Sequence, residues 1–458
     1  MSRSRLSITF KAGAIAILTC AASGAAKAET LADALVTAYK HSHLLDQNRA
    51  LLRATDENVA QAVASLRPII SFIATSNYSP TRAPGVDNLQ SQIGLDASLL
   101  LYDNGASQLA IDVAKETVLA TREALVSLEQ NVLFGAVSAY LDVVSAAEFV
   151  QLRGNNVRLL TQELRAAQDR FEVGDVTRTD VALAEARFAA ARSGEAAAIG
   201  TLAVARESFR AAIGRYPGQL TAVPRVPRIP NTLKEAEALA VRTHPDIRQA
   251  QRNVTIADLN IGRAQAAMKF TVNASSQFRL DQDGNDTFST GIQLNQPIYR
   301  GGTLTSALRQ AKANRDAQRA ALLNTTHLVR QSVGNAWANV AVTQAQLAAT
   351  DRQIRASQIA FRGFQEEAKL GSRTTLEVLD AEQELLDART NRVDAQSQQY
   401  VAIYSLLSAM GLLTAEHLGL GVQTYDPAAY YTAVKSAPVP SSKRGKQLDK
   451  VLKRLGQN

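Results

Sequence analysis

Carboxylates gather at two matching points of the chain, and each group follows a glycine that interrupts a long helical pattern. The first stretch is Gly174–Glu185 and the second is Gly371–Glu382, which begins 197 positions later. Glycine suits the left-handed end of one helix, and threonine with an acid a few positions on starts the next. Each stretch therefore predicts the tip of a helical hairpin at which acids collect.

Three of these acids, Asp180, Glu377 and Asp380, are expected within the first turns of the helices that leave the tips. One interpretation is an ordinary first-turn cap, worth about 0.3–1 kcal/mol per acid. The other is a ring of acids around a passage, which would attract cations and repel its own copies. Arg373 lies four positions before Glu377 and would offset part of that repulsion.

Other residue patterns do not indicate catalysis or a cofactor. The histidines form no i, i+4 pair of the kind that binds zinc on a helix. The chain also has no phosphate-binding glycine loop and no nucleophile elbow. Adjacent acids such as Glu366 and Glu367 are typical of a solvated helix face. The sequence therefore predicts a protein that is not an enzyme.

The formal net charge of +8 is concentrated at the two ends of the 458-residue chain. Basic residues give +4 within positions 1–28, and the segment from Lys435 onward gives +6, which leaves −2 for the body. A nearly neutral body argues against a nucleic-acid partner.

The N-terminus has the pattern of a secretory signal peptide, assigned to residues 1–28. Basic residues precede an apolar run from Ala12 to Ala22, and Ala26-Lys27-Ala28 offers a small-x-small cleavage site. The apolar run is much shorter than the ~20 residues that a membrane-spanning helix needs. Cys20, the single cysteine, lies inside this segment. The exported chain is therefore expected to hold no disulfide and no cysteine-bound metal.

The rest of the chain repeats one order of elements twice, at shifts of 202 and then 197 positions. Identical residues recur in register, among them Tyr102, Gly105, Arg122 and Gly214 with their partners. The first predicted helix–strand–strand–helix repeat is 29–216, with strands at about 68–78 and 89–101. A Pro-rich linker at 217–231 leads to the second repeat at 232–420, with strands at about 269–280 and 286–298. A flexible basic tail is predicted at 421–458.

Two periodicities distinguish the helices from the strands. Apolar residues recur every seven positions in the long helical regions, as at Val143, Val150 and Val157 and again at Val333, Val340 and Leu347. This spacing is the coiled-coil condition. The four strands alternate between an apolar and a polar face. Their length fits the ~9–11 residues of a tilted membrane strand. Four strands cannot close a barrel, and lipid tolerates no open edge, so several chains would have to share one barrel.

These features together resemble the TolC-like outer membrane efflux and secretion proteins. The resemblance covers residues 30 to 420 and includes the Tyr-x-x-Gly exit from the second strand, the run from Gln296 to Gly302 and both glycine tips. It implies an α+β membrane protein of the outer membrane. In that family a homotrimer forms a 12-stranded β-barrel from four strands per chain, and long coiled-coil-like helices continue as a periplasmic tunnel. It also implies docking to a periplasmic adaptor protein and an inner-membrane transporter, either an ABC exporter or a proton-driven pump, for the export of small molecules or secreted proteins.

The resemblance also assigns roles at the tips. The acidic positions of the family's constriction match Asp180, Glu377 and Asp380, and Arg373 matches the arginine of its polar network. Ala368 stands where the family has a tyrosine, so any bond from that hydroxyl must be absent or replaced. The exposed tip residues expected to meet the adaptor are Gly174, Asp175, Thr177, Gly371, Ser372 and Thr374.

An alternative interpretation is a periplasmic coiled-coil adaptor or scaffold of an export complex. Such a protein would share the export signal, the seven-residue repeats and the helical hairpins. It would not need two strand pairs with a lipid-type alternation.

Overall fold

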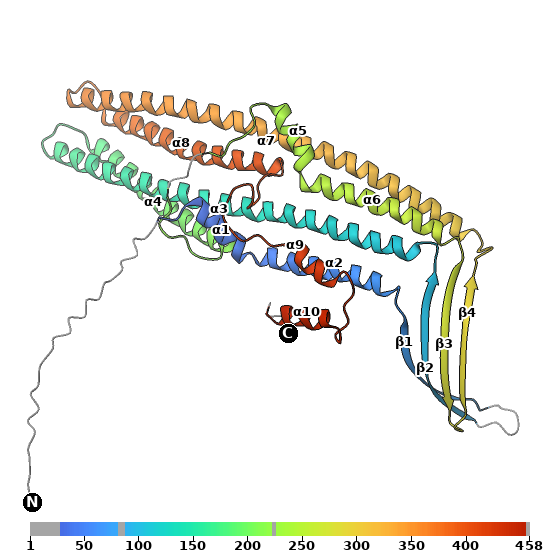
Figure 1. The fold of residues 1–458 in the computed structure, drawn as a ribbon. Coiled ribbons are helices and arrows are strands. Elements are labelled where there is room, and N and C mark those ends of the chain that lie inside the picture. Colours follow the sequence, from blue (N-terminus) through green and yellow to red (C-terminus); the bar gives the residue numbers. More distant parts are fainter. Residues whose placement is uncertain (1–27, 81–87, 222–225, 455–458) are drawn as a thin grey trace, which may run out of the picture.

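The computed structural model of the chain describes residues 28–80, 88–221 and 226–454. The predicted signal peptide lies outside the described residues except for its last position. The described chain forms an elongated molecule, with long helices running along its length and a sheet at one end (Figure 1).

Two copies of the same unit make up most of the molecule. The first copy contains α1 (Leu31–His41), α2 (His43–Ala64), β1 (Ile69–Tyr78), β2 (Leu89–Tyr102), α3 (Ala106–Glu172) and α4 (Arg178–Ile213). The second contains α5 (Leu233–Thr243), α6 (Pro245–Ala266), β3 (Thr271–Asp281), β4 (Asp286–Asn295), α7 (Thr303–Lys369) and α8 (Thr375–Ala409). Equivalent helices match in length, with 11 residues in α1 and α5, 22 in α2 and α6, and 67 in α3 and α7.

Equivalent threonines start equivalent helices. The Thr30 hydroxyl accepts a hydrogen bond from the Asp33 amide at 3.2 Å, and the Thr232 hydroxyl accepts one from the Glu235 amide at 3.2 Å. Each cap satisfies one of the free amides that a helix N-terminus leaves without an internal partner. The first helix of each repeat, α1 or α5, therefore begins at the same relative position.

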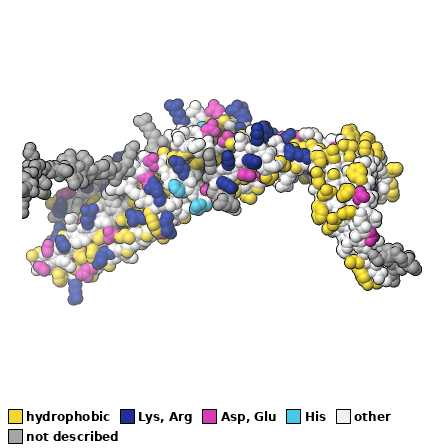
Figure 2. All heavy atoms as spheres, turned by 60° about the horizontal axis from the view of Figure 1, so that its bottom comes forward, with side chains coloured by type: hydrophobic (Ala, Val, Ile, Leu, Met, Phe, Trp, Pro, Cys, Tyr) yellow, Lys and Arg dark blue, Asp and Glu magenta, His cyan; other side chains and the backbone are white. Residues whose placement is uncertain are grey.

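The four strands form one antiparallel sheet in the order β1-β2-β3-β4. The register aligns Phe72, Leu95, Phe278 and Phe288 in one row across all four strands. These apolar side chains share a face, and Phe72 and Phe288 are each 68 % exposed. Figure 2 shows hydrophobic side chains gathered over the sheet. A sheet with so much exposed apolar surface requires an apolar environment on that side.

The neighbouring row on the opposite face is polar. It consists of Ser71, Asp96, Gln277 and Ser289 in the same register. An ion pair between Asp96 and Arg279, with 2.7 Å between Oδ1 and Nη1, lies on the same polar face. Within the described residues, the outer edges of β1 and β4 pair with no further strand. One chain therefore provides an open sheet with one apolar and one polar face.

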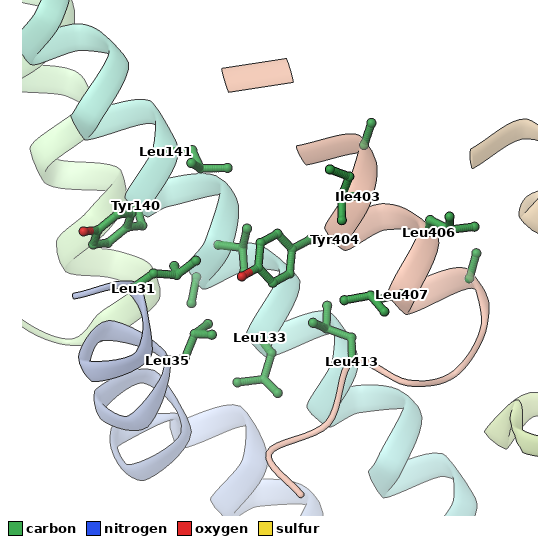
Figure 3. Close-up of a cluster of buried hydrophobic side chains, with 14 of the residues drawn as sticks. Leu31, Leu35, Leu133, Tyr140, Leu141, Ile403, Tyr404, Leu406, Leu407 and Leu413 are labelled. Carbon is green, nitrogen blue, oxygen red and sulfur yellow. The ribbon is translucent and has the colours of Figure 1, made fainter. Parts of the chain in front are cut away.

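The largest core lies where the two helical hairpins meet, away from the sheet. Leu35 of α1, Leu133 and Tyr140 of α3 and Leu407 of α8 are buried in this core, where side chains of α8 lie across from those of α1 and α3 (Figure 3). The Tyr140 hydroxyl donates to the carbonyl oxygen of Thr221 at 2.8 Å, which provides its polar group with a partner. One stretch of α3 is long and apolar enough to span a membrane by composition, and 44 % of it is buried inside the molecule. Its apolar character is explained by this core.

Two further helices, α9 (Pro427–Val434) and α10 (Lys443–Arg454), follow the second repeat. They lie in the segment that the sequence predicts to be a flexible basic tail, at 421–458. The Asp426 side chain caps α9 by accepting from the Ala428 amide at 2.8 Å. Tyr430 then donates from its hydroxyl to Glu57 of α2 at 2.7 Å, so α9 lies against the first repeat.

Candidate functional site at the helical tips

The two helical hairpins, α3–α4 and α7–α8, turn at the end of the molecule that is farthest from the sheet (Figure 1). The first tip is defined as residues 173–180 and the second tip as residues 370–380. Both contain the glycine and threonine that the sequence singles out. The glycine turn and the threonine cap of each tip are held by local hydrogen bonds.

In the first tip, Gly174 has a φ angle of 81°, which only glycine adopts without strain. The Asp175 amide donates to the Arg170 carbonyl at 2.9 Å and closes the end of α3. Thr177 then caps α4 in a reciprocal pair with Asp180, whose Oδ2 accepts from the Thr177 amide at 2.9 Å and from its hydroxyl at 2.7 Å. These bonds from Thr177 lower the pKa of Asp180, so its carboxylate remains charged well below neutral pH.

The second tip repeats this arrangement. Gly371 has a φ angle of 76°, and the Ser372 amide donates to the Glu367 carbonyl at 3.0 Å. Thr374 caps α8, and its amide donates to Glu377 Oε2 at 2.9 Å. The hydrogen bond from the Thr374 amide has the largest effect in lowering the pKa of Glu377, and the hydrogen bond from Arg373 lowers it further.

Arg373 ties the two helices of the second hairpin to each other. Its Nε lies 2.8 Å from Glu367 Oε2 on α7, and its Nη1 lies 2.8 Å from Glu377 Oε1 on α8. The guanidinium also lies 4.7 Å from the centre of the Phe364 ring. The hydrogen bonds to Glu367, which has the larger effect, and to Glu377 raise the pKa of Arg373. Ala368, one residue after Glu367, has no side-chain group that could contribute to this network.

Asp380 lies outside the Arg373 network and joins the two hairpins instead. Its Oδ1 accepts from Arg187 Nη2 of α4 at 2.6 Å. The tips thus bring Arg373 and Glu377 together, whereas Asp180 bonds only to its own cap among the described contacts and Asp380 pairs across to the first repeat. No pattern in the sequence singles out Arg187 or Glu367 as partners.

A buried polar contact close to Asp380 is also absent from the sequence-based prediction. Glu382 is 5 % exposed, and its Oε1 accepts from Asn156 Nδ2 of α3 at 2.6 Å. Burial raises the pKa of Glu382 to about 7. In the sequence Glu382 stands out only as the equivalent of Glu185 in the first repeat, which does not indicate that it is buried.

The residues expected to contact an adaptor are all exposed; they are Gly174, Asp175, Thr177, Gly371, Ser372 and Thr374. Two large apolar side chains are exposed beside them, with Val173 at 79 % and Leu370 at 84 %. Val173 and Leu370 also occupy equivalent positions of the two repeats. Across the described ranges, no group of three or more His, Cys, Asp or Glu side chains is arranged to hold a metal ion.

Comparison with known proteins identifies the arrangement. A family model described as outer membrane efflux protein matches residues 34–215 and, separately, residues 238–412. The chain belongs to the outer membrane efflux protein family. The two matches coincide with the two structural repeats, so each repeat carries the family pattern.

Individual relatives agree with the family assignment. The outer membrane efflux protein BepC of Brucella suis biovar 1 (strain 1330) is 36 % identical over 420 residues, which cover 90 % of this chain and 91 % of BepC. The outer membrane protein TolC of Vibrio cholerae serotype O1 is 26 % identical and covers 86 % of this chain and 93 % of that protein. The crystal structure of the Campylobacter jejuni CmeC outer membrane channel superposes with a TM-score of 0.74 at 17 % identity, covering 90 % of each chain. The fold is therefore that of the outer membrane channels.

Proposed function

We propose that three copies of the chain pool their strands in one twelve-stranded barrel that crosses the outer membrane. The observation that carries this proposal is the four-stranded sheet with two unpaired outer edges, among the described strands, and a continuous apolar face. Lipid provides no partner for the backbone groups of an open edge, so β4 of one copy would pair with β1 of the next. The polar row that contains Asp96 would then line the water-filled interior.

The long helices would continue the barrel as a periplasmic tunnel that narrows at the two tips. In a threefold ring, Asp180, Glu377 and Asp380 would each face two copies of themselves, which favours cation attraction and opposes closure. Arg373 offsets the charge of Glu367 and Glu377 within one chain. We propose these tip residues as the gate. In place of the tyrosine bond that Ala368 excludes, the tie from Arg373 to both helices would hold the second tip closed.

The tips would also be the docking surface for a periplasmic adaptor protein. Exposed apolar residues at a charged helical tip favour a partner that covers them, and Val173 and Leu370 provide such a pair in each chain. Through the adaptor the channel would receive cargo from an inner-membrane transporter, either an ABC exporter or a proton-driven pump. The chain would act as a passive duct for small molecules or secreted proteins and would catalyse no reaction.

Cell fractionation together with the mass of the purified protein tests the barrel proposal. The expected result is a chain that sediments with the outer membrane and a trimer that survives extraction in mild detergent. Reconstitution in planar bilayers should then give stepwise single-channel currents. A monomer that is recovered dissolved in the periplasm would contradict the proposal and would favour the adaptor interpretation.

A further inference from the structure

Glu382 is a carboxyl group buried at the interface between α3 and α8, two turns into the helix that carries the second tip. It is 5 % exposed, and Asn156, which donates to it at 2.6 Å, is 8 % exposed. The contact joins residues 226 positions apart that belong to different repeats. Any outward movement of α8 from α3 must therefore break it and admit water to Glu382.

The charges that face Glu382 come from the neighbouring helices. Glu163 of α3 opposes its ionisation, whereas Arg187 of α4 favours it. Arg187 is shared, because it also pairs with Asp380 on α8 at 2.6 Å. The burial of Glu382 outweighs the attraction of Arg187, which itself is partly neutralised by Asp380.

A cavity of about 250 Å³ lies beside the Glu382 contact, between α3, α7 and α8. The polar residues around it include Arg362 and Gln365 of α7 and Arg389 of α8, together with Glu382 itself. Gln365 is in turn within 3.5 Å of Glu163. A cavity of this size with polar walls can admit water molecules, so water can reach the buried carboxyl group once α8 moves away from α3.

We propose that Glu382 is a positioning residue of the gate: in its neutral form it holds α8 against α3 and keeps the second tip closed, and in its ionised form it releases α8. This inference rests on the proposed function of the tips as a gate. It adds to the tip residues a buried switch that responds to pH. Asn156 is the donor that adjusts the pH at which the switch acts.

The direction of the effect follows from proton linkage. With α8 packed, the pKa of Glu382 is raised to about 7, and when water reaches the group it returns toward its ordinary value of 4.5. Between these two values the packed state binds more protons, so acid favours the closed gate. The open-to-closed ratio should rise by up to about tenfold per pH unit and per chain across this window and level off above it.

The pH profile of single-channel conductance in planar bilayers tests this inference on the full-length trimer. Wild type should open as pH rises from 4.5 to about 7, over the window that linkage predicts, and should change little above it. Glu382→Gln, which mimics the neutral carboxyl group, should remain closed and lose the rise. Asp394→Asn removes another α8 carboxylate whose pKa is raised by burial, and as the matched control it should keep the wild-type profile.

Asn156→Leu provides a second variant with a distinct outcome. The Asn156 hydrogen bond lowers the pKa of Glu382, so its removal should move the conductance midpoint to higher pH without abolishing the transition. Infrared difference spectra recorded during the titration, after subtraction of the Glu382→Gln spectra, should show a protonated-carboxyl band that disappears near the same midpoint. This band reports on Glu382 whether or not the tip acts as a gate.

The outcomes separate the inference from the proposed function. If no variant or wild type conducts, the channel proposal fails. If wild type conducts and Glu382→Gln has the same pH profile, the positioning role of Glu382 is overturned while the channel stands. A midpoint that is unchanged in Asn156→Leu would likewise overturn the assigned role of Asn156.

Discussion

Loss of the Arg187–Asp380 ion pair should favour the open gate, because this pair connects α4 of the first hairpin to α8 of the second. The Nη2 to Oδ1 distance is 2.6 Å, and the two side chains are 36 % and 56 % exposed. Arg187→Gln removes the charge and keeps a polar side chain. Asp380 would then lose its partner and add its uncompensated charge to the ring of acids.

The size of the effect can be worked out from this exposure. Because water screens both side chains, each pair is worth about 0.2–1 kcal/mol. If the three copies of the tip move together, the free energy of the closed state rises by about 0.6–3 kcal/mol relative to that of the open state. Since about 1.4 kcal/mol corresponds to a tenfold change in an equilibrium constant, the ratio of open to closed channels should rise about 3- to 150-fold. The lower end is expected at high salt, where screening is strongest.

Single-channel recording at about pH 6 isolates this contribution. Arg187 also lowers the pKa of Glu382, but at that pH Glu382 in the packed state is mostly protonated with or without the arginine. Arg192→Gln is the matched control, since Arg192 is an arginine of the same helix and lies over the Phe188 ring. The double variant Arg187→Gln/Asp380→Asn should open less than Arg187→Gln alone, because no unpaired acid remains. Equal currents in Arg187→Gln and Arg192→Gln would refute the reasoning.

Four further outcomes are expected. Arg373→Glu should raise single-channel conductance, because it replaces the cation between two acids with a third acid. Asp180→Ala should weaken the block of current by multivalent cations added on the periplasmic side. In wild type this block should persist even below the ordinary aspartate pKa of 3.8, since hydrogen bonds from Thr177 lower the pKa of Asp180. Phe278→Arg on the apolar face should cost about 2–4 kcal/mol per chain and reduce trimer yield in the membrane, whereas Gln277→Arg on the polar face should be tolerated. Asp56, with 0 % exposure, has its pKa raised by burial from 3.8 to about 6, so Asp56→Asn should increase the unfolding free energy at about pH 7 by about 1–3 kcal/mol. Thermal unfolding should show this gain vanish below about pH 4.

The strands show what alternation alone can predict. Period-two spacing places Ile70 and Phe72 on one face, and the structure agrees, because successive strand residues point to opposite sides regardless of partner. The end of β4 is harder to predict: the pattern continues to about residue 298, whereas the strand ends at Asn295. Pro297 lies just beyond and has no amide to continue the ladder, so the strand ends before it.

The tail shows the limit of composition as a predictor. Its prolines and basic residues indicate a flexible segment, and within that segment Asp426 and Pro427 form a regular helix start. What stabilises α9 is distant in sequence: the carbonyl of Pro427 accepts from Arg122 at 3.1 Å, and the Tyr431 ring lies 5.4 Å from the same guanidinium. A contact across 305 positions leaves no local pattern.

The same reasoning explains why the tips can be located from sequence but their partners cannot. Capping by Thr177 and Thr374 is local, so the spacing of three residues to the acid determines it in both repeats. Burial is not local, and here the repeats diverge: Glu185 is exposed, whereas the equivalent Glu382 is buried against α3. Identical residues at equivalent positions thus have different surroundings, because α8 packs on both hairpins and α4 packs mainly on α3. If pH acts on the gate, it should therefore act through the second hairpin, and Glu185→Gln should leave unchanged the pH profile that Glu382→Gln removes.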